Sequence, residues 1–171
     1  MDQGRATLHM LCGKIAAGKS SLAARLAAAP ATVLLAEDHL LARLYPGEIA
    51  SLDDYRRCAG RLRGAIERHI VDLLKEGVSV VLDFQANTPA ARAWMRSLFE
   101  AAGADHRLHW LDTPEAVCKA RLAARNAAGT HDYQVSDEEF DLFTRHFVPP
   151  ASDEGFALVV HPLPGVPRSK P

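Results

Sequence analysis

The segment GKIAAGKS, residues 13–20, constrains the fold of this chain more than any other feature of its sequence. It fits the pattern G-x-x-x-x-G-K-[ST] and lies between an apolar run ending at Cys12 and an alanine-rich segment with helical character. In this pattern the backbone amides of the loop and of the following helix surround phosphate oxygens, Lys19 reaches the β- and γ-phosphates, and the Ser20 hydroxyl binds Mg²⁺. An ordinary turn between a strand and a helix is the alternative, and the strand–loop–helix context favours phosphate binding. The residues that we expect around the phosphates are Gly13, Lys14, Ile15, Ala16, Ala17, Gly18, Lys19, Ser20 and Ser21.

Apolar runs alternate with longer helical patterns along the whole chain. Nearly all-apolar strands separated by helices are typical of an α/β protein whose parallel sheet is covered on both faces. Ligands bind at the carboxyl ends of the strands in such sheets, so residues 13–20, Asp38, Asp83 and Asp112 should gather along one edge. We expect strands over 6–12, 31–37, 78–84, 106–112 and 156–162, and helices over 19–29, 51–76, 88–102, about 113–128, and 136 to about 149.

The composition is that of an ordinary globular protein. The 171 residues form most simply one domain over 1–162, and LPGVPRSKP (163–171) looks like a disordered tail. A formal net charge of −1 gives no general attraction to nucleic acid or to a membrane. The apolar runs are shorter than a membrane span and the first residues lack a signal-peptide core, so we expect a cytoplasmic protein without a membrane partner. The three cysteines and eight histidines lack metal-site spacing, and we expect the cysteines to be small buried residues.

Two aspartates at strand ends are candidates for chemistry beside the loop. Asp83 ends the apolar run VVLD, where a carboxylate can hold the magnesium shell through a bound water; its alternative role is to cap a turn. Asp38 follows the second strand and would face the γ-phosphate, which suits a group that accepts a proton from an attacking hydroxyl. A helix N-cap is the alternative for Asp38, and Glu37 is a competing candidate whose side chain would point differently. Asp112 precedes Thr113-Pro114, so helix capping explains it better.

Arg121 and Arg125 lie four residues apart in the helical segment CKARLAARN, which places them on one face. Two guanidinium groups there could close over ATP and neutralise the charge that develops on the transferring phosphoryl group. A solvated helix face is the alternative. We favour the catalytic and nucleotide-binding role, for Arg121 more than for Arg125.

The acceptor pocket has the weakest sequence signal. Polar residues that follow the third strand could touch an acceptor, and His39 and Arg43 lie one helical turn apart near Asp38, where solvent-facing roles are as plausible. Tyr133, Phe140 and Phe143 are expected to be packing residues, Trp94 and Trp110 core residues, and His131 an exposed loop residue. The candidate acceptor-binding residues are Asp38, Arg43, Gln85 and Arg92, with Asn87 beside them.

The loop, Asp38, VVLDFQANTPAAR (80–92) and ARLAARN (120–126) together resemble small P-loop kinases, often catalogued as AAA-family ATP-binding proteins. That group is similar to the 5′-polynucleotide kinase domain, chloramphenicol phosphotransferase, gluconate kinase and zeta-toxin kinases. The resemblance covers about residues 6–161 and implies a three-layer P-loop NTPase fold with strand order 2-3-1-4-5, ATP·Mg²⁺ as donor, and a mobile helical lid at about 121–147. In these relatives the acid after strand two is the general base or orients the acceptor hydroxyl, which matches Asp38. Their lid arginine near adenine or the phosphates matches Arg121.

The sequence therefore predicts an ATP- and Mg²⁺-dependent kinase that phosphorylates a hydroxyl group of a small molecule. The chain is too short for the helical second domain of an AAA+ motor and carries no N-K-x-D motif of a GTPase. Two alternatives stay open. One is a 5′-hydroxyl polynucleotide kinase, which the lack of a global basic charge disfavours. The other is a regulatory ATPase or nucleotide switch that transfers nothing.

Overall fold

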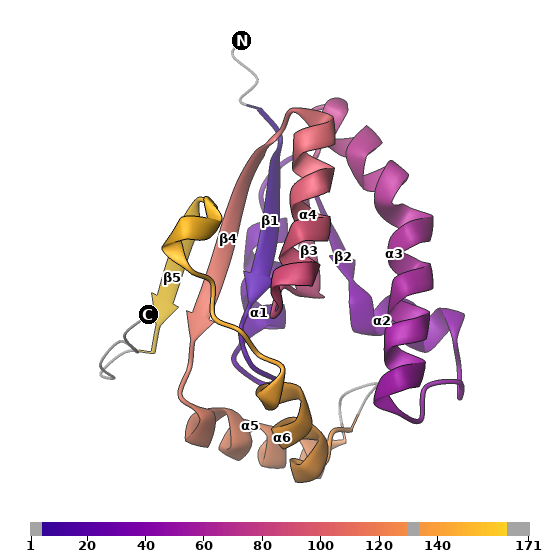
Figure 1. Cartoon of the computed structure of the whole chain (residues 1–171), viewed down its shortest axis with the longest axis vertical. Helices are drawn as coiled ribbons and strands as arrows, with labels where there is room; N and C mark the ends of the chain where they lie inside the picture. Colours follow the sequence, from indigo (N-terminus) through magenta and orange to yellow (C-terminus); the bar gives the residue numbers. More distant parts are fainter. Residues whose placement is uncertain (1–4, 130–133, 164–171) are drawn as a thin grey trace.

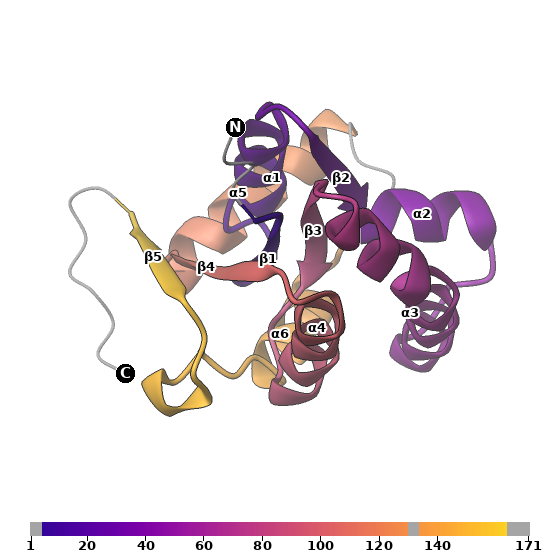
Figure 2. The ribbon, with the colours of Figure 1, turned by 90° about the horizontal axis from the view of Figure 1, so that it is seen from above.

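Five parallel strands form one sheet in the computed structural model, which describes residues 5–129 and 134–163 (Figures 1 and 2). The strand order is β2-β3-β1-β4-β5, and every neighbouring pair is parallel. This confirms the predicted α/β fold and its strand order. The expectations for His131 and Tyr133, and for a tail beyond Leu163, lie outside the described residues. The strands are β1 (Thr7–Cys12), β2 (Thr32–Ala36), β3 (Ser79–Gln85), β4 (Asp105–Asp112) and β5 (Leu158–Pro162).

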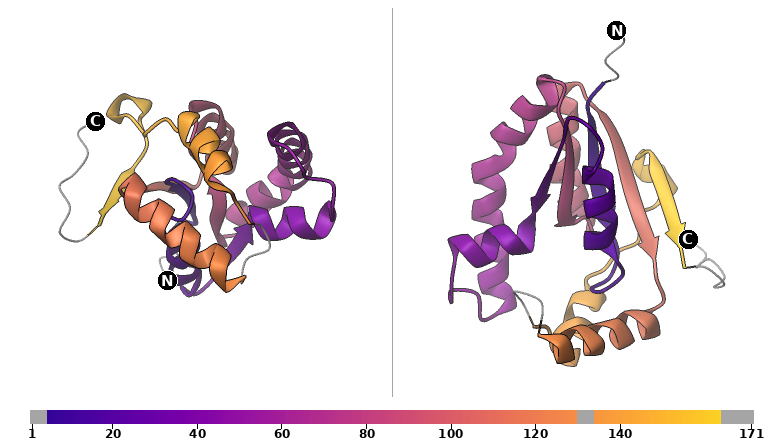
Figure 3. Two further views of the ribbon diagram at one scale, coloured as in Figure 1. Left: turned by 90° about the horizontal axis from the view of Figure 1, so that it is seen from below. Right: turned by 180° about the vertical axis from the view of Figure 1, so that it is seen from behind.

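Helices cover both faces of the sheet and its carboxyl edge. Helices α3 and α4 pack on one face, and α1 packs on the other, as seen from behind in Figure 3 (right). The short α2 continues directly from β2, while α5 and α6 lie across the carboxyl ends of the strands (Figure 1; Figure 3, left). The helices are α1 (Lys19–Ala27), α2 (Glu37–Leu44), α3 (Leu52–Lys75), α4 (Pro89–Ala102), α5 (Glu115–Ala128) and α6 (Asp137–Arg145), with a 3₁₀ turn at Ser152–Glu154.

The central strands bury apolar side chains on both faces because successive residues of a strand point in opposite directions. In β1, Leu8 and Met10 pack with α3 and α4, whereas Leu11 packs with α1. In β3, Leu82 and Val81 divide in the same way. The nearly all-apolar strands of the sequence therefore have the two-sided burial that was expected of them.

Local signals in the sequence set several of the helix boundaries. The Ser51 hydroxyl accepts a hydrogen bond from Asp54 N at the start of α3, and the Thr88 hydroxyl accepts one from Ala91 N at the start of α4. A capping box of Ser136 and Glu139 starts α6, as its Ser-x-x-Glu pattern predicted. The starts of these three helices were therefore predictable from their capping residues.

The structure also differs from the sequence prediction in places. The eight-residue helix α2 was not among the predicted helices, and Ala36 occupies its N-cap position, so Asp38 lies inside the first turn and does not cap the helix. Helix α6 ends at Arg145, before the two prolines at 149–150. Helix α5 begins at Glu115, and Pro114 rather than Asp112 occupies its N-cap position.

The expected core residues are buried. Trp110 is buried and Trp94 packs against the core at partial exposure. Cys12, Cys58 and Cys118 are free and buried, as expected of small apolar residues. Within residues 5–129 and 134–163, the structure contains no helix long and apolar enough to cross a membrane.

Candidate active site

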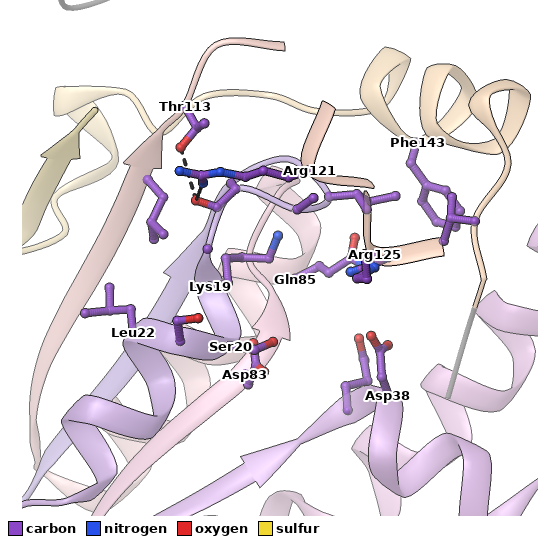
Figure 4. Close-up of a pocket in the computed structure, with 18 of the residues that line it drawn as sticks. Lys19, Ser20, Leu22, Asp38, Asp83, Gln85, Thr113, Arg121, Arg125 and Phe143 are labelled. Atoms are coloured by element: carbon purple, nitrogen blue, oxygen red, sulfur yellow. Dashed lines mark hydrogen bonds between the residues drawn. The ribbon is translucent and has the colours of Figure 1, made fainter. Parts of the chain in front are cut away.

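A cavity of about 960 Å³ opens at the carboxyl edge of the sheet, where α5 and α6 cover the strand ends (Figure 4). The loop of residues 15–21 forms one wall, and Glu37 and Asp38 form part of another. Asp83, Gln85, Arg121 and Arg125 also line it, so most of the candidate site residues come together in one space. Elements separated by more than one hundred residues in sequence thus share a single pocket.

The loop that precedes α1 holds an unusual backbone conformation. Gly18 has φ of 106°, a left-handed value that L side chains rarely adopt, and Ala16 has φ of 61°. Helix α1 begins immediately afterwards with no side-chain cap and no acidic residue in its first turn. The backbone N–H groups of a helix start attract anions because they lack partners within the helix. The backbone of this loop is therefore compatible with the predicted phosphate cradle.

The Lys19 ammonium group is hydrogen-bonded to backbone carbonyl groups of its own loop. Its Nζ donates hydrogen bonds to Gly13 O at 2.6 Å and to Lys14 O at 2.8 Å. Burial lowers the pKa of Lys19, and the negative charge of Asp83 partly opposes this shift. Two backbone carbonyl oxygens thus hold the Lys19 amine inside the loop.

Ser20 and Asp83 provide oxygen atoms on the same side of the cavity, as Figure 4 shows. Hydroxyl and carboxylate oxygens suit Mg²⁺, which is usually held by one or two protein groups together with waters and substrate phosphates. Among the described residues there is no cluster of three or more His, Cys, Asp or Glu with the geometry of a metal site. The residues present fit a magnesium ion bound together with a nucleotide better than an ion caged by protein alone.

The neighbouring acids Glu37 and Asp38 have different environments. Glu37 is 1% exposed, and its carboxylate accepts hydrogen bonds from Tyr55 Oη at 2.7 Å and from Arg63 Nη2 at 2.9 Å. Asp38 instead faces the cavity (Figure 4). Desolvation of its carboxylate by the surrounding protein raises the pKa of Asp38 to about 6, and the negative charges of Glu37 and Asp83 contribute less to this shift. Of the two acids that line the cavity, Glu37 has its carboxylate engaged by protein donors, whereas the side chain of Asp38 is turned to the cavity.

Arg121 and Arg125 extend from α5 into the cavity, as their spacing predicted. Arg121 Nη1 donates to Ala17 O at 3.3 Å, and the same carbonyl accepts a hydrogen bond from Thr113 Oγ1 at 3.1 Å (Figure 4). Arg125 points toward the gap that Asp38 faces (Figure 4), and its buried Nε has no hydrogen-bond partner among the described residues. Burial lowers the pKa of Arg125, while the charge of Asp38 opposes the shift. Arg121 thus contacts the loop before α1, whereas Arg125 points toward the side of Asp38.

The candidate acceptor-binding residues differ in their position relative to the cavity. Gln85 lines the cavity. Arg43 is exposed on α2 and is not among the residues that line it. Arg92 corrects the sequence expectation, because it is 0% exposed and its guanidinium group binds both carboxylate oxygens of Glu154, at 2.6 and 2.8 Å. Arg92 is a buried structural residue and is not available to an acceptor.

Two aromatic residues that were not predicted as site residues also line the cavity. Tyr55, in α3, and Phe143, in α6, stack edge to face with their ring centroids 5.8 Å apart. Phe143 was expected only to pack, and Tyr55 was read only as part of a helical pattern. Their pairing links α3 to α6 across the cavity, and no local sequence signal could have revealed it.

A chain of three imidazole rings was also missed. His109 lies between His9 and His161, with a ring-nitrogen distance of 3.0 Å to each, so β1, β4 and β5 are joined. Burial, followed by the neighbouring positive groups, lowers the pKa of His109 to about 4. His161 also lines the cavity. These rings belong to strands that become neighbours only in the folded sheet, so the spacing of the histidines in the sequence could not predict their contact.

A phosphate loop after β1, a sheet of order β2-β3-β1-β4-β5 and arginines on a helix above the loop define a P-loop kinase fold. A family model described as AAA domain matches residues 8–150, and the chain belongs to this family. No curated protein matches the chain significantly in sequence.

Solved structures with the same fold include several kinases. A proposed kinase from Chloroflexus aurantiacus has a TM-score of 0.73 at 20% identity, covering 93% of this chain and 86% of that one. The APS kinase of Mycobacterium tuberculosis, solved in complex with AMPPNP and APS, has a TM-score of 0.61 at 21% identity and covers 96% and 91%. A gluconokinase from Sinorhizobium meliloti has a TM-score of 0.60 at 17% identity and covers 96% and 85%. At these identities the likeness establishes the shared fold.

Proposed function

We propose that this protein is an ATP- and Mg²⁺-dependent kinase that transfers the γ-phosphate to a hydroxyl group of a small molecule. The observation that carries the proposal is the position of Asp38, which faces the cavity with its pKa raised to about 6. A protein that only binds nucleotide, without transfer or hydrolysis, has no attacking group whose proton must be removed. A kinase needs such a group to accept the proton of the attacking hydroxyl.

The remaining site residues divide between the donor and the transferred charge. Lys19 and the amides of residues 13–20 would bind the phosphates, and Ser20, with Asp83 acting through water, would hold Mg²⁺. Bound Mg²⁺ supplies neutralisation of the charge on the β- and γ-phosphate oxygens. Arg121 and Arg125 would stabilise the transferring phosphoryl group as α5 and α6 close as a lid. Gln85 remains a candidate contact to the acceptor.

The fold supports a small-molecule acceptor. The described cavity is enclosed by α2, α3 and α6 on the side of Asp38, with the Tyr55–Phe143 pair on its wall. Two proteins that share the fold are named for action on small molecules, one as an APS kinase and the other as a gluconokinase. A pocket walled by helices and aromatic rings suits a compact molecule better than an extended strand.

The test is acceptor-dependent release of ADP. The purified chain is incubated with ATP and Mg²⁺ and with separate sets of hydroxyl-bearing metabolites, antibiotics and 5′-hydroxyl oligonucleotides. We expect ADP release to rise only with a small-molecule acceptor, and mass spectrometry to find one added phosphate on it. Phosphate transfer to oligonucleotides alone would indicate a polynucleotide kinase. ATP hydrolysis that no acceptor stimulates would indicate a regulatory ATPase.

The pH dependence of transfer should report the ionisation of Asp38. Only its carboxylate form can accept a proton, and a raised pKa means that this form is lost when the pH falls through about 6. We expect kcat/KM for the acceptor, which reports ionisation of the protein before the acceptor binds, to be constant above this value and to fall about tenfold per pH unit below it. The measurement is kcat/KM across the acid range. A limb that stays unchanged in Asp38→Asn would assign the titration to another group.

A further inference from the structure

Asn87, immediately after β3, binds the first residue of the phosphate loop through both ends of its side-chain amide. Its Oδ1 accepts a hydrogen bond from Gly13 N at 2.9 Å, and its Nδ2 donates one to Gly13 O at 2.9 Å. A backbone N–H can only donate and a carbonyl can only accept, so the orientation of the amide is fixed by these two contacts. Gly13 is buried and closely packed, since a Cβ atom on it would lie 3.2 Å from Leu111 O.

The carbonyl that Asn87 holds is also one of the two that hold Lys19. Gly13 O accepts hydrogen bonds from Lys19 Nζ at 2.6 Å and from Asn87 Nδ2 at 2.9 Å. Lys14 O accepts one from Lys19 Nζ at 2.8 Å and one from Ala17 N at 3.1 Å. Each carbonyl therefore has a second donor besides the lysine. When Lys19 turns toward the phosphates of a nucleotide, neither carbonyl loses its last partner.

We propose that Asn87 is a positioning residue of the phosphate loop. Its side chain keeps Gly13 in place, and it keeps the Gly13 carbonyl hydrogen-bonded when the Lys19 side chain turns from that carbonyl to the phosphates of a nucleotide. The proposal rests on the nucleotide binding that the proposed function requires. A buried carbonyl without a donor is costly, so removal of the Asn87 amide would make the departure of Lys19 unfavourable. The cost would arise only for ligands with the phosphates that Lys19 reaches.

An ion pair with a buried guanidinium group holds the backbone of Asn87 in place. Arg92 Nη1 donates to Ala86 O and to Val148 O, both at 3.0 Å, and Val148 N donates to Asn87 O at 2.8 Å. Glu154 binds the other side of the same guanidinium group through two hydrogen bonds. Bidentate guanidinium–carboxylate pairs set orientation as well as distance. Arg92 and Glu154 thus hold the backbone of residues 86–87 from which the Asn87 side chain reaches Gly13.

The experiment compares two nucleotides and two neighbouring substitutions. Affinities for AMPPNP and AMP, both with Mg²⁺, are measured for the wild type, Asn87→Ala and Thr88→Ala. Thr88→Ala is the matched control, because it removes the α4 cap one residue away without touching Gly13. We expect Asn87→Ala to bind AMPPNP about tenfold more weakly with its AMP affinity unchanged. Thr88→Ala should bind both nucleotides as the wild type does.

Two further variants separate the parts of the network. Asn87→Asp keeps an acceptor for Gly13 N but loses the donor to Gly13 O. Hydrogen exchange of the Gly13 amide should therefore stay slow in this variant and become faster in Asn87→Ala, while AMPPNP binding is weakened in both. Arg92→Lys keeps a positive charge beside Glu154 but cannot form the same set of hydrogen bonds, so it should weaken AMPPNP binding in the same direction.

The outcomes distinguish this proposal from the proposed function. Unchanged AMPPNP affinity in a folded Asn87→Ala, or an equal loss for AMP and AMPPNP, would overturn the positioning role. An equal loss in Thr88→Ala would also overturn it, because the effect would then be one of stability. A wild type that binds AMPPNP but phosphorylates no acceptor would overturn the kinase proposal and leave the role of Asn87 standing. A wild type that does not bind AMPPNP would overturn both.

Discussion

Asp38→Asn is expected to lower phosphoryl transfer about 10²- to 10⁴-fold while AMPPNP affinity stays within about twofold of the wild type. The asparagine amide fills the same space but cannot accept the proton of an attacking hydroxyl. The nucleotide phosphates would be held by the loop before α1, which this substitution does not touch. Single-turnover transfer and equilibrium AMPPNP binding, measured on the same preparation, separate the two effects.

The control for this result is Asp53→Asn, which makes the same chemical change on an exposed residue of α3. It should leave both transfer and binding unchanged. Transfer at the wild-type rate in Asp38→Asn would contradict the general-base role, whereas a parallel loss of AMPPNP binding would indicate a role in holding the donor.

Asp38→Asn should also stabilise the fold, with a characteristic pH dependence. The pKa of Asp38 is about 6 in the folded protein, above the ordinary value of 3.8, so its ionisation disfavours the folded state. Both states are protonated in strong acid, and the variant should then match the wild type. The free energy of unfolding of the variant should exceed that of the wild type by an amount that grows as the pH rises from 3.8 to about 6 and remains constant above about pH 6. Urea unfolding of the two proteins at several pH values measures the difference.

Lys19→Ala is expected to weaken AMPPNP binding about 10- to 100-fold, because it removes charge-assisted hydrogen bonds to the phosphates. The matched control is Lys75→Ala at the end of α3, since Lys75 is exposed and is not among the residues that line the cavity. That variant has the same change in charge and should bind AMPPNP nearly as the wild type does. Equal losses in both variants would assign the effect to general electrostatics.

The stability of the Lys19→Ala variant without nucleotide gives a second readout. Its loop carbonyls retain Asn87 Nδ2 and Ala17 N as donors, and a buried ammonium group is no longer desolvated. We therefore expect its melting temperature to stay close to that of the wild type, whereas added AMPPNP and Mg²⁺ should raise it much less. A marked loss of stability without nucleotide would mean that Lys19 has a structural role in the loop and that its role is not confined to binding phosphate.

The features that could be predicted from the sequence are those with local signals. The phosphate loop has a fixed spacing within eight residues, and the helix starts at Ser51, Thr88 and Ser136 have capping residues beside them. The strands were recognisable because both of their faces are apolar. Gathering of Asp38 and Asp83 beside the loop followed from the rule that parallel strands end at one edge, and the strand order followed from the family resemblance.

Arg92 and Asn87 could not be assigned correctly because their partners are distant in sequence. Glu154, which binds Arg92, lies 62 residues further along the chain, and Gly13 lies 74 residues before Asn87. Both residues follow a strand end, where polar side chains commonly meet ligands, yet both turn toward protein groups. Position along the strand was predictable, whereas the direction of each side chain depended on contacts that form only on folding.

The two sides of the cavity are built from different parts of the fold, and this has a consequence for how such a protein can diversify. The loop before α1 and Asp83 are set by the central strands, whose buried residues form the core. The side of Asp38 is formed by α2, the first turn of α3, and α6, where α2 buries only Glu37 and Leu41 and α6 buries only Phe140. Substitutions there disturb few core contacts, so the acceptor of the proposed kinase can change over evolution, or by design, while the proposed donor site is inherited intact.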